Sequence, residues 1–268
     1  MGIAPPGSRI GDYVVDEELP ARPGVFSSTH VLLPRKAHIV LPDPVRAHEL
    51  ACLLETIRHP AVPRLFECGR LGDRPWLAIS IVEGPTLTER LAVAPLAVTE
   101  AIALIRDLAA VLAHAHSTGI VHGDLRAELI VQSRTGWQIA DWSEADHADD
   151  HAIDTRALGT IAYAALARAL PTLPLERRCP GVPVALTRLI DGMLDEPPAA
   201  ERVHAEASRL VEDLAEPEDA VSVSVSVSVS VSDIVLLDVM RPPPIPVRLR
   251  VRAQGTGPVI LTAFKKEP

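Results

Sequence analysis

The chain has 268 residues, of which 47% are hydrophobic and 3% aromatic, and its formal net charge is −9 at pH 7. This length allows one large domain or one domain with a small appendage, and the apolar fraction excludes wholesale disorder. The acidic balance and the scarcity of aromatic side chains argue against nucleic acid as a partner. The three scattered cysteines, the lack of an apolar run of membrane-spanning length and the lack of a signal-peptide pattern favour a cytoplasmic protein.

The first eighty residues alternate between strand-like and helical patterns. Residues 10–41 predict short strands at 25–26, 31–33 and 38–41, separated by Pro-Gly and Pro-Arg turns. Apolar residues then recur at helical spacing over 45–59 until a His-Pro pair ends the helix. Residues 62–83 return to strand character, with a hairpin turn at Gly72-Asp73. This part of the chain is therefore β-rich with one helix.

The following residues, up to about 214, are mainly helical. One helix is expected to begin at a Thr99 cap and another at Asp154, with further helices around 186–193 and 203–210. Between the first two helices, residues 130–141 predict a hairpin with a Thr-Gly turn. A β-rich first part and a helical second part predict an α+β fold with two lobes.

The last part of the chain, 215–268, has a different pattern. Six Val-Ser pairs over 221–232 place every valine on one face, as in a half-buried strand. Residues 247–252 and 259–261 then predict a hairpin. We expect a small β appendage, with a low-complexity linker as the alternative. In the first case, residues 221–232 are a candidate surface for self-association.

The segment from Gly119 to Ile130, with Ile139 to Ser143 after it, resembles the catalytic and metal-binding loops of the protein-kinase-like superfamily. Further motifs that resemble bacterial Ser/Thr protein kinases occur in the expected order, at 59–65, 83–87, 112–116, 154–159 and 193–202. The resemblance covers residues 10–214. It implies a β-rich N-lobe over about 10–82 and a helical C-lobe over about 83–214.

The resemblance also implies roles for individual residues. Asp124 stands at the position of the catalytic base and Asp141 at that of the metal ligand that holds Mg²⁺ against the phosphates of ATP. Arg126 stands where kinases have a lysine that contacts phosphate. The resemblance also places three residues at the nucleotide cleft. These are Ile79, Ile81 and Val82, which precede the connection between the lobes.

Other parts of the phosphoryl-transfer machinery are missing. The second metal ligand, normally Asn, is replaced by Leu129, and the strand lysine that binds the α- and β-phosphates is replaced by Val40. Lys36 is four strand residues away from that position, about 13 Å at roughly 3.3 Å per residue. The Gly-rich loop is reduced to Gly24 between prolines and bulky residues.

The activation segment is the largest departure from the family. Only 13 positions separate Asp141 from Asp154, and neither a peptide-docking segment nor an APE motif fits there. One metal ligand without a phosphate-binding lysine would leave the developing charge poorly stabilised. The sequence therefore predicts a pseudokinase that acts as a regulatory or scaffolding module for another protein, with weak or no binding of ATP and Mg²⁺.

Two alternatives remain open at this point. One is an atypical ATP-dependent phosphotransferase, acting on proteins or on small molecules as aminoglycoside and choline kinases do, with Asp124 as base and Asp141 as metal ligand. The other is a structural protein that pairs through its C-terminal strands. A run of aspartate and histidine residues, 146–154, is expected to be a solvated acidic loop, with a divalent metal site as the alternative.

Overall fold

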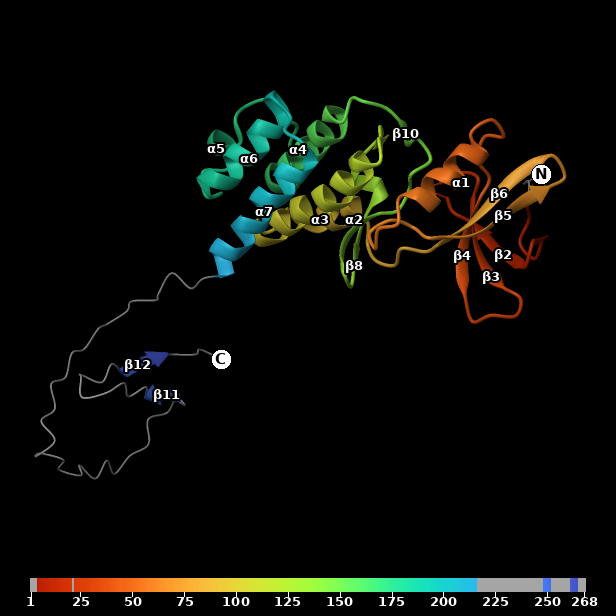
Figure 1. Ribbon diagram of the computed structural model, residues 1–268, viewed down its shortest axis with the longest axis horizontal. Coiled ribbons are helices and arrows are strands. Elements are labelled where there is room, and N and C mark those ends of the chain that lie inside the picture. The colour runs from red at the N-terminus through yellow and green to blue at the C-terminus, as the bar shows by residue number, and fades with distance from the viewer. Residues whose placement is uncertain (1–3, 21, 216–247, 252–260, 265–268) are drawn as a thin grey trace, which may run out of the picture. The chain divides into compact units, whose positions relative to one another are not determined.

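The computed structural model describes residues 4–20, 22–215, 248–251 and 261–264. The chain separates into two compact units, residues 1–216 and 217–268. One end of the first unit is a β-sheet with helix α1 (Ala47–Thr56) beside it, and the other end is a group of helices (Figure 1). The two-lobe α+β arrangement expected from the sequence is confirmed.

The first lobe is a six-stranded antiparallel sheet in the order β1-β2-β3-β4-β6-β5. Its strands are β1 (Arg9–Ile10), β2 (Tyr13–Glu18), β3 (Val25–His30), β4 (Lys36–Val40), β5 (Leu65–Leu71) and β6 (Arg74–Ser80). Helix α1 (Ala47–Thr56) connects β4 to β5, and β6 returns to pair with β4, with His38 opposite Ile79. This connection places α1 beside the sheet (Figure 1).

The two faces of this sheet contribute to different cores because side chains alternate along each strand. Tyr13, Phe26 and Ile39 are buried together with Trp76 on one face. On the other face, Leu77 and Ile79 pack into the larger core that includes the apolar face of α1. One face of the sheet therefore carries a small core of its own, and the other face shares the larger core with α1 and the second lobe.

The second lobe is built around a long buried helix. Its helices are α2 (Leu87–Val93), α3 (Val98–Ser117), α4 (Ala152–Ala167), α5 (Leu175–Arg178), α6 (Val184–Asp195) and α7 (Ala200–Ala215). Helix α3 packs against both α4 and α7, and its apolar face is almost fully buried. Thr86 caps α2 in a reciprocal capping box with Glu89.

Short elements connect α3 to α4 and carry the segments with kinase-like motifs. They are β7 (Ile120–Val121), η1 (Ala127–Leu129), β8 (Ile130–Ser133), β9 (Gly136–Ile139) and β10 (Asp146–His147). Strands β8 and β9 form the hairpin expected around the Thr-Gly turn, and β10 pairs antiparallel with β7. The short connection from Asp141 to α4 thus folds back onto the start of the catalytic-loop segment.

Three local expectations were wrong. Residues 31–33 form an exposed turn rather than a strand, because the Nδ1 atom of His30 accepts the backbone N–H groups of Leu32 and Leu33. Helix α3 begins before Thr99, and the side chain of Glu100 accepts the N–H of Ala97 at its start. Helix α4 begins at Ala152, so Asp154 lies in its first turn.

In the second unit, β11 (Arg248–Val251) pairs antiparallel with β12 (Leu261–Phe264), which gives the strands of the expected hairpin. The Val-Ser run at 221–232 lies outside the described residues. Within the part of the chain that the structure describes, no helix combines the length and the apolar character needed to cross a bilayer.

Candidate functional site

A cleft of about 600 Å³ lies between the sheet and the catalytic-loop segment. Its walls come from the turn between β2 and β3, from β4, from residues 82–86 and from the segments around 126–131 and 140–143. Several of the lining side chains are apolar, namely Leu19, Val25, Val40, Leu129 and Val131. This cleft is the place where the resemblance locates nucleotide binding.

Asp141 lies in this cleft, and both of its carboxylate oxygens are engaged. Oδ2 is 2.7 Å from Nη2 of Arg22, which extends from the turn between β2 and β3. The Arg22 and Asp141 side chains are 17% and 20% exposed. The contact is an ion pair rather than a well-directed hydrogen bond, since Nη2 has no hydrogen-bond partner of good geometry. Oδ1 of Asp141 accepts the N–H of Ser143 at 3.0 Å.

The catalytic-loop segment is held in place by the buried carboxylate of Asp154. The N–H of His122 donates to Oδ2 at 2.8 Å, and the N–H of Gly123 donates to Oδ1 at 2.9 Å. Nε2 of His116, on α3, lies 2.9 Å from Oδ2. One side chain in the first turn of α4 thereby joins α3, α4 and the loop.

These contacts determine the charge of Asp154. Burial by itself would raise the pKa of Asp154, but the hydrogen bonds from His116, His122 and Gly123 outweigh it and lower the pKa below its ordinary value. Asp154 is therefore a carboxylate at neutral pH. Its charge is stabilised by fixed donors, as a buried anion requires.

His122 links the same loop to the Asp141 segment. Its Nε2 donates to the backbone carbonyl of Asp141 at 2.8 Å, and its Nδ1 accepts the N–H of Asp124 at 3.3 Å. Burial lowers the pKa of His122, although the hydrogen bond to the Asp141 carbonyl and the nearby carboxylates oppose this effect. The neutral imidazole, with one donor and one acceptor nitrogen, matches both contacts. His122 thus orients the loop, and the ring of Trp142 packs edge-on against it.

Asp124 and Arg126 form a pair at the edge of the cleft. Their side chains are 2.9 Å apart and are 36% and 58% exposed, respectively. Arg126 lines the cleft itself. Of the candidates from the sequence, Arg126, Asp141 and Val82 thus meet at one cleft, with Asp124 attached to Arg126.

Ile79 and Ile81 are placed differently. Ile79 is 5% exposed and lies in the main core on the strand that packs against α1, while Ile81 is partly exposed beyond the end of β6. Neither side chain lines the cleft, where Val82 does. The alternation of side chains along an extended segment accounts for part of this difference.

Strand β4 presents two side chains to the cleft, His38 and Val40. Burial and the nearby Arg22 guanidinium lower the pKa of His38 to about 4, against an opposing effect of Asp141. His38 is therefore uncharged at neutral pH. Lys36 lies at the exposed start of the strand, outside the cleft lining.

The residues at this site do not fit the Mg²⁺ ion that the resemblance implies. Mg²⁺ needs several oxygen ligands around it. Asp141 forms an ion pair with Arg22. The position that the resemblance assigns to the second ligand is occupied by Leu129, which is 8% exposed, lines the cleft and has no side-chain oxygen. Among the described residues, no group of three or more histidine, cysteine or carboxylate side chains is arranged to hold a metal ion, and this includes the run at 146–154.

Two residues important for this site were not recognised as such in the sequence. Arg22 carries no motif, and only the folded turn brings it to Asp141. The sequence predicts Asp154 as a helix start, but its role in holding the loop depends on contacts with residues more than thirty positions away.

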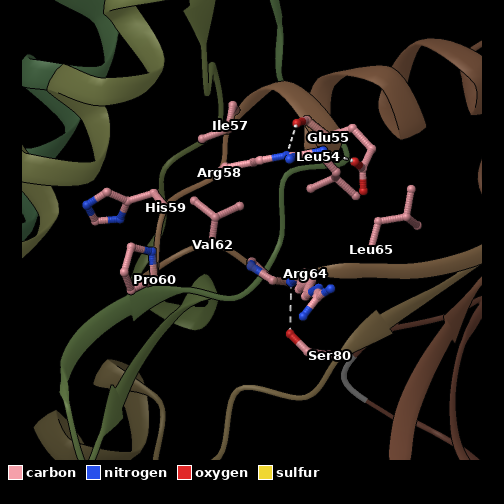
Figure 2. Close-up of a pocket in the computed structure, with 11 residues that line it drawn as sticks. Leu54, Glu55, Ile57, Arg58, His59, Pro60, Val62, Arg64, Leu65 and Ser80 are labelled. Carbon is pink, nitrogen blue, oxygen red and sulfur yellow. Dashed lines mark hydrogen bonds and ion pairs between the residues drawn. The ribbon is translucent and has the colours of Figure 1, made fainter.

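A second hollow of about 560 Å³ lies behind α1, along residues 57–65 (Figure 2). Figure 2 shows the polar groups there turned toward one another: Arg58 contacts Glu55 at 2.8 Å, and the N–H of Arg64 donates to Ser80 Oγ at 2.9 Å. Burial and the neighbouring His114 lower the pKa of His59 at its rim. The chemistry expected from the sequence lies in the first cleft.

Several protein kinases have sequences similar to this chain. The chain is 38% identical to serine/threonine-protein kinase pkn2 of Myxococcus xanthus over 85 residues, which are 32% of this chain and 10% of that protein. It is 27% identical to serine/threonine-protein kinase PknJ of Mycobacterium tuberculosis over 128 residues, 45% of this chain and 21% of PknJ. The chain thus spans about a fifth or less of these relatives. No family profile matches the chain.

Among solved structures, the kinase domain of Mycobacterium tuberculosis PknI is similar to this one. The TM-score is 0.64 at 21% sequence identity, and the match covers 80% of this chain and 100% of that chain. The identity is low, so the comparison establishes the fold.

Proposed function

The chain belongs to the protein-kinase-like superfamily, and from this premise we propose that it is a pseudokinase. In this proposal residues 10–214 form a kinase-like domain that serves as a regulatory or scaffolding module for another protein. Residues 215–268 form an appendage to it. Nucleotide binding is weak or does not occur.

The observation that carries the proposal is the set of side chains at the positions where phosphoryl transfer needs ligands. The cleft has apolar side chains, Val40 and Leu129, where kinases of this superfamily have a lysine and an asparagine. Asp141 is paired with Arg22. Phosphoryl transfer depends on positive groups that stabilise the charge on the transferred phosphate, and such groups are not free at these positions.

A second candidate function is an atypical phosphotransferase. The open cleft with Asp141 in its wall, and the loop that carries Asp124 in an ordered conformation, favour it. In that case Asp124 would accept the proton of the acceptor hydroxyl. The pairing of Asp124 with Arg126 and of Asp141 with Arg22 supports the pseudokinase instead.

Phosphate transfer separates the two candidates. We would incubate the full chain with γ-labelled ATP and Mg²⁺ or Mn²⁺, with basic protein and small-molecule alcohol acceptors, next to the variants Asp124→Asn and Asp141→Asn. The pseudokinase proposal expects the wild-type chain to incorporate no more label than either variant. Label that is incorporated by the wild type and lost in both variants would establish the enzyme and overturn the proposal.

A gain-of-function variant tests the same point from the other side. Val40→Lys together with Leu129→Asn returns two of the missing ligand types to the cleft. We expect thermal melting of the double variant to respond more strongly to ATP than melting of the wild type, because the added lysine binds phosphate directly. Val40→Met with Leu129→Met is the matched apolar control, because it changes the same positions without adding a ligand. If the wild type already responds as strongly as the double variant, Val40 and Leu129 do not limit binding.

A further inference from the structure

The turn between β2 and β3 folds back on itself through its own backbone. The N–H of Leu19 donates to the carbonyl of Val25 at 2.8 Å, and the N–H of Val25 donates to the carbonyl of Arg22 at 3.1 Å. The N–H of Arg22 donates to the carbonyl of Leu19 at 3.0 Å. The N–H and the carbonyl of Arg22 are therefore both engaged in hydrogen bonds within the turn, and its side chain extends from this hydrogen-bonded backbone.

The remaining amides of this turn are also accounted for among its described residues. Gly24 donates its N–H to the side chain of Glu18 at 2.9 Å, and Pro20 and Pro23 carry no N–H. Loops that bind phosphate do so with free backbone N–H groups that point at the anion. In the described part of this turn, the backbone N–H groups donate to acceptors within the turn and its flanking strands. The turn presents the guanidinium group of Arg22 to the cleft instead.

The Arg22 guanidinium lies beside Asp141, the carboxylate that the resemblance assigns to a metal ion. Arg22 Nη2 is 2.7 Å from Oδ2 of Asp141, and both side chains are about four-fifths buried. Burial limits screening by water and salt, so the pair is stronger than one on an open surface. A divalent ion that approached Asp141 would have to displace Arg22, and it would meet the hydrocarbon side chain of Leu129 on the same cleft wall.

We propose that Arg22 is a built-in counter-ion for Asp141, which makes the cleft accept its ligand without a divalent metal ion. Residue 22 then determines the metal specificity of the cleft, which discriminates against metal-complexed polyphosphates. The ligand class is a compound that packs a ring on the apolar walls and brings no metal. This inference rests on the proposed pseudokinase function, which it deepens by assigning the group that replaces the metal.

The test compares Arg22→Gln with Arg9→Gln in the full chain. Arg9 makes an exposed ion pair of similar length, 2.8 Å, with Asp12 in the same lobe, so its variant controls for the loss of a positive charge. The probes are MgCl₂ and MnCl₂ alone, at ionic strength matched with NaCl, followed by adenosine, ATP and ATP with Mg²⁺. The readouts are thermal melting and the amount of bound Mn²⁺ measured by electron paramagnetic resonance.

We expect the wild type and Arg9→Gln to bind no Mn²⁺ and to melt at a temperature independent of the metal. Arg22→Gln should gain Mn²⁺ binding and a metal-dependent rise in melting temperature, and both should disappear in Arg22→Gln with Asp141→Asn. The proposal is overturned if Arg22→Gln responds to metal no differently from Arg9→Gln. It is also overturned if the wild type binds Mn²⁺ in a way that Asp141→Asn abolishes.

These outcomes are distinguishable from failure of the proposed function. Pseudokinase status fails when the wild-type chain transfers labelled phosphate, whereas the role of Arg22 fails in metal binding without any acceptor. Electron paramagnetic resonance reports bound Mn²⁺ directly, so the comparison does not require the variants to have equal melting temperatures. A variant with lower stability therefore still gives a decisive result, provided that it is folded at the temperature of the measurement.

Discussion

The surroundings of Asp154 and the cleft beside them differ in how well they match the kinase pattern. Around Asp154, the contacts that hold the catalytic-loop segment are complete: a buried carboxylate receives two backbone N–H groups and lies beside His116. In the cleft, the positions that would hold metal and phosphate carry Val40, Leu129 and an internal ion pair. The loop is thus held by a complete set of contacts, whereas the cleft has apolar side chains and an ion pair at the positions compared.

This difference indicates what the fold itself requires. A buried anion such as Asp154 destabilises the fold unless its hydrogen-bond donors are present. The stability of the fold is therefore enough to account for these contacts. The cleft positions have no comparable constraint, because an apolar side chain in a cleft wall leaves no polar group unsatisfied. An intact loop is therefore evidence for the fold rather than for catalysis. The comparison predicts large stability effects around Asp154 and small ones in the cleft.

The largest effect is expected for Asp154→Ala. Removal of this carboxylate leaves the N–H groups of His122 and Gly123 buried without partners, and we expect a loss of about 3–5 kcal/mol in the free energy of unfolding. Urea denaturation followed by circular dichroism measures it. Asp149→Ala, an exposed aspartate nearby, is the control and should change stability by about 0.5 kcal/mol or less. Similar losses in the two variants would contradict the comparison.

A smaller effect is expected for His122→Ala. The ring is 1% exposed, and its removal leaves the carbonyl of Asp141 without its donor and opens space beside Trp142. We expect a loss of about 1–3 kcal/mol, measured in the same way. His147→Ala, at an exposed histidine of β10, should be close to neutral. If His122→Ala were equally neutral, the ring would not hold the loop.

The features that the sequence predicted are those that depend on local patterns. Helical spacing located α1, α6 and α7 within a few residues, and the motif around Asp124 and Asp141 located the loop segment because its residues are consecutive. The ion pair between Arg22 and Asp141 could not be predicted in this way. It joins two loops far apart in the chain, and it depends on the conformation of a turn that no periodic pattern describes.

The same reasoning explains the errors at strand and helix ends. Apolar residues at 31–33 looked like a strand, but the ring of His30 captures two backbone N–H groups and forms a turn. The position of Ile79, Ile81 and Val82 near the lobe connection predicts all three at the nucleotide cleft, and of these Val82 lines the cleft described above. Which face of a strand borders a cleft is decided by the packing of the neighbouring elements, so the two isoleucines could not be assigned from sequence position alone.

The ion pair in the cleft should contribute less to stability than the contacts of Asp154. A double-mutant cycle with Arg22→Ala and Asp141→Ala is expected to give a coupling energy of about 1 kcal/mol, since the pair is largely but not fully buried. The same cycle at the exposed pair of Arg9 and Asp12 should give about 0.5 kcal/mol or less. A coupling at Arg22 as small as that at Arg9 would show that burial does not strengthen the cleft pair.

A separate effect, visible only as a dependence on pH, concerns His38, whose pKa is lowered to about 4 by burial and by Arg22. The unfolded chain has the ordinary histidine pKa of about 6.5, so between these two values it binds more protons at this position than the folded chain. Stability linked to His38 is therefore complete above pH about 6.5 and is lost as the pH falls toward about 4.

Urea denaturation at a series of pH values tests this with His38→Gln, which removes the titrating group. We expect the wild type to lose more stability on acidification than His38→Gln, with the difference growing through that pH range. His147→Gln, at an exposed histidine, should follow the wild-type curve. Parallel curves for the wild type and His38→Gln would mean that His38 is solvated like a surface histidine. In that case the cleft wall near Arg22 would be more open to water than the contacts of Asp154, and the contrast between the two regions would be larger.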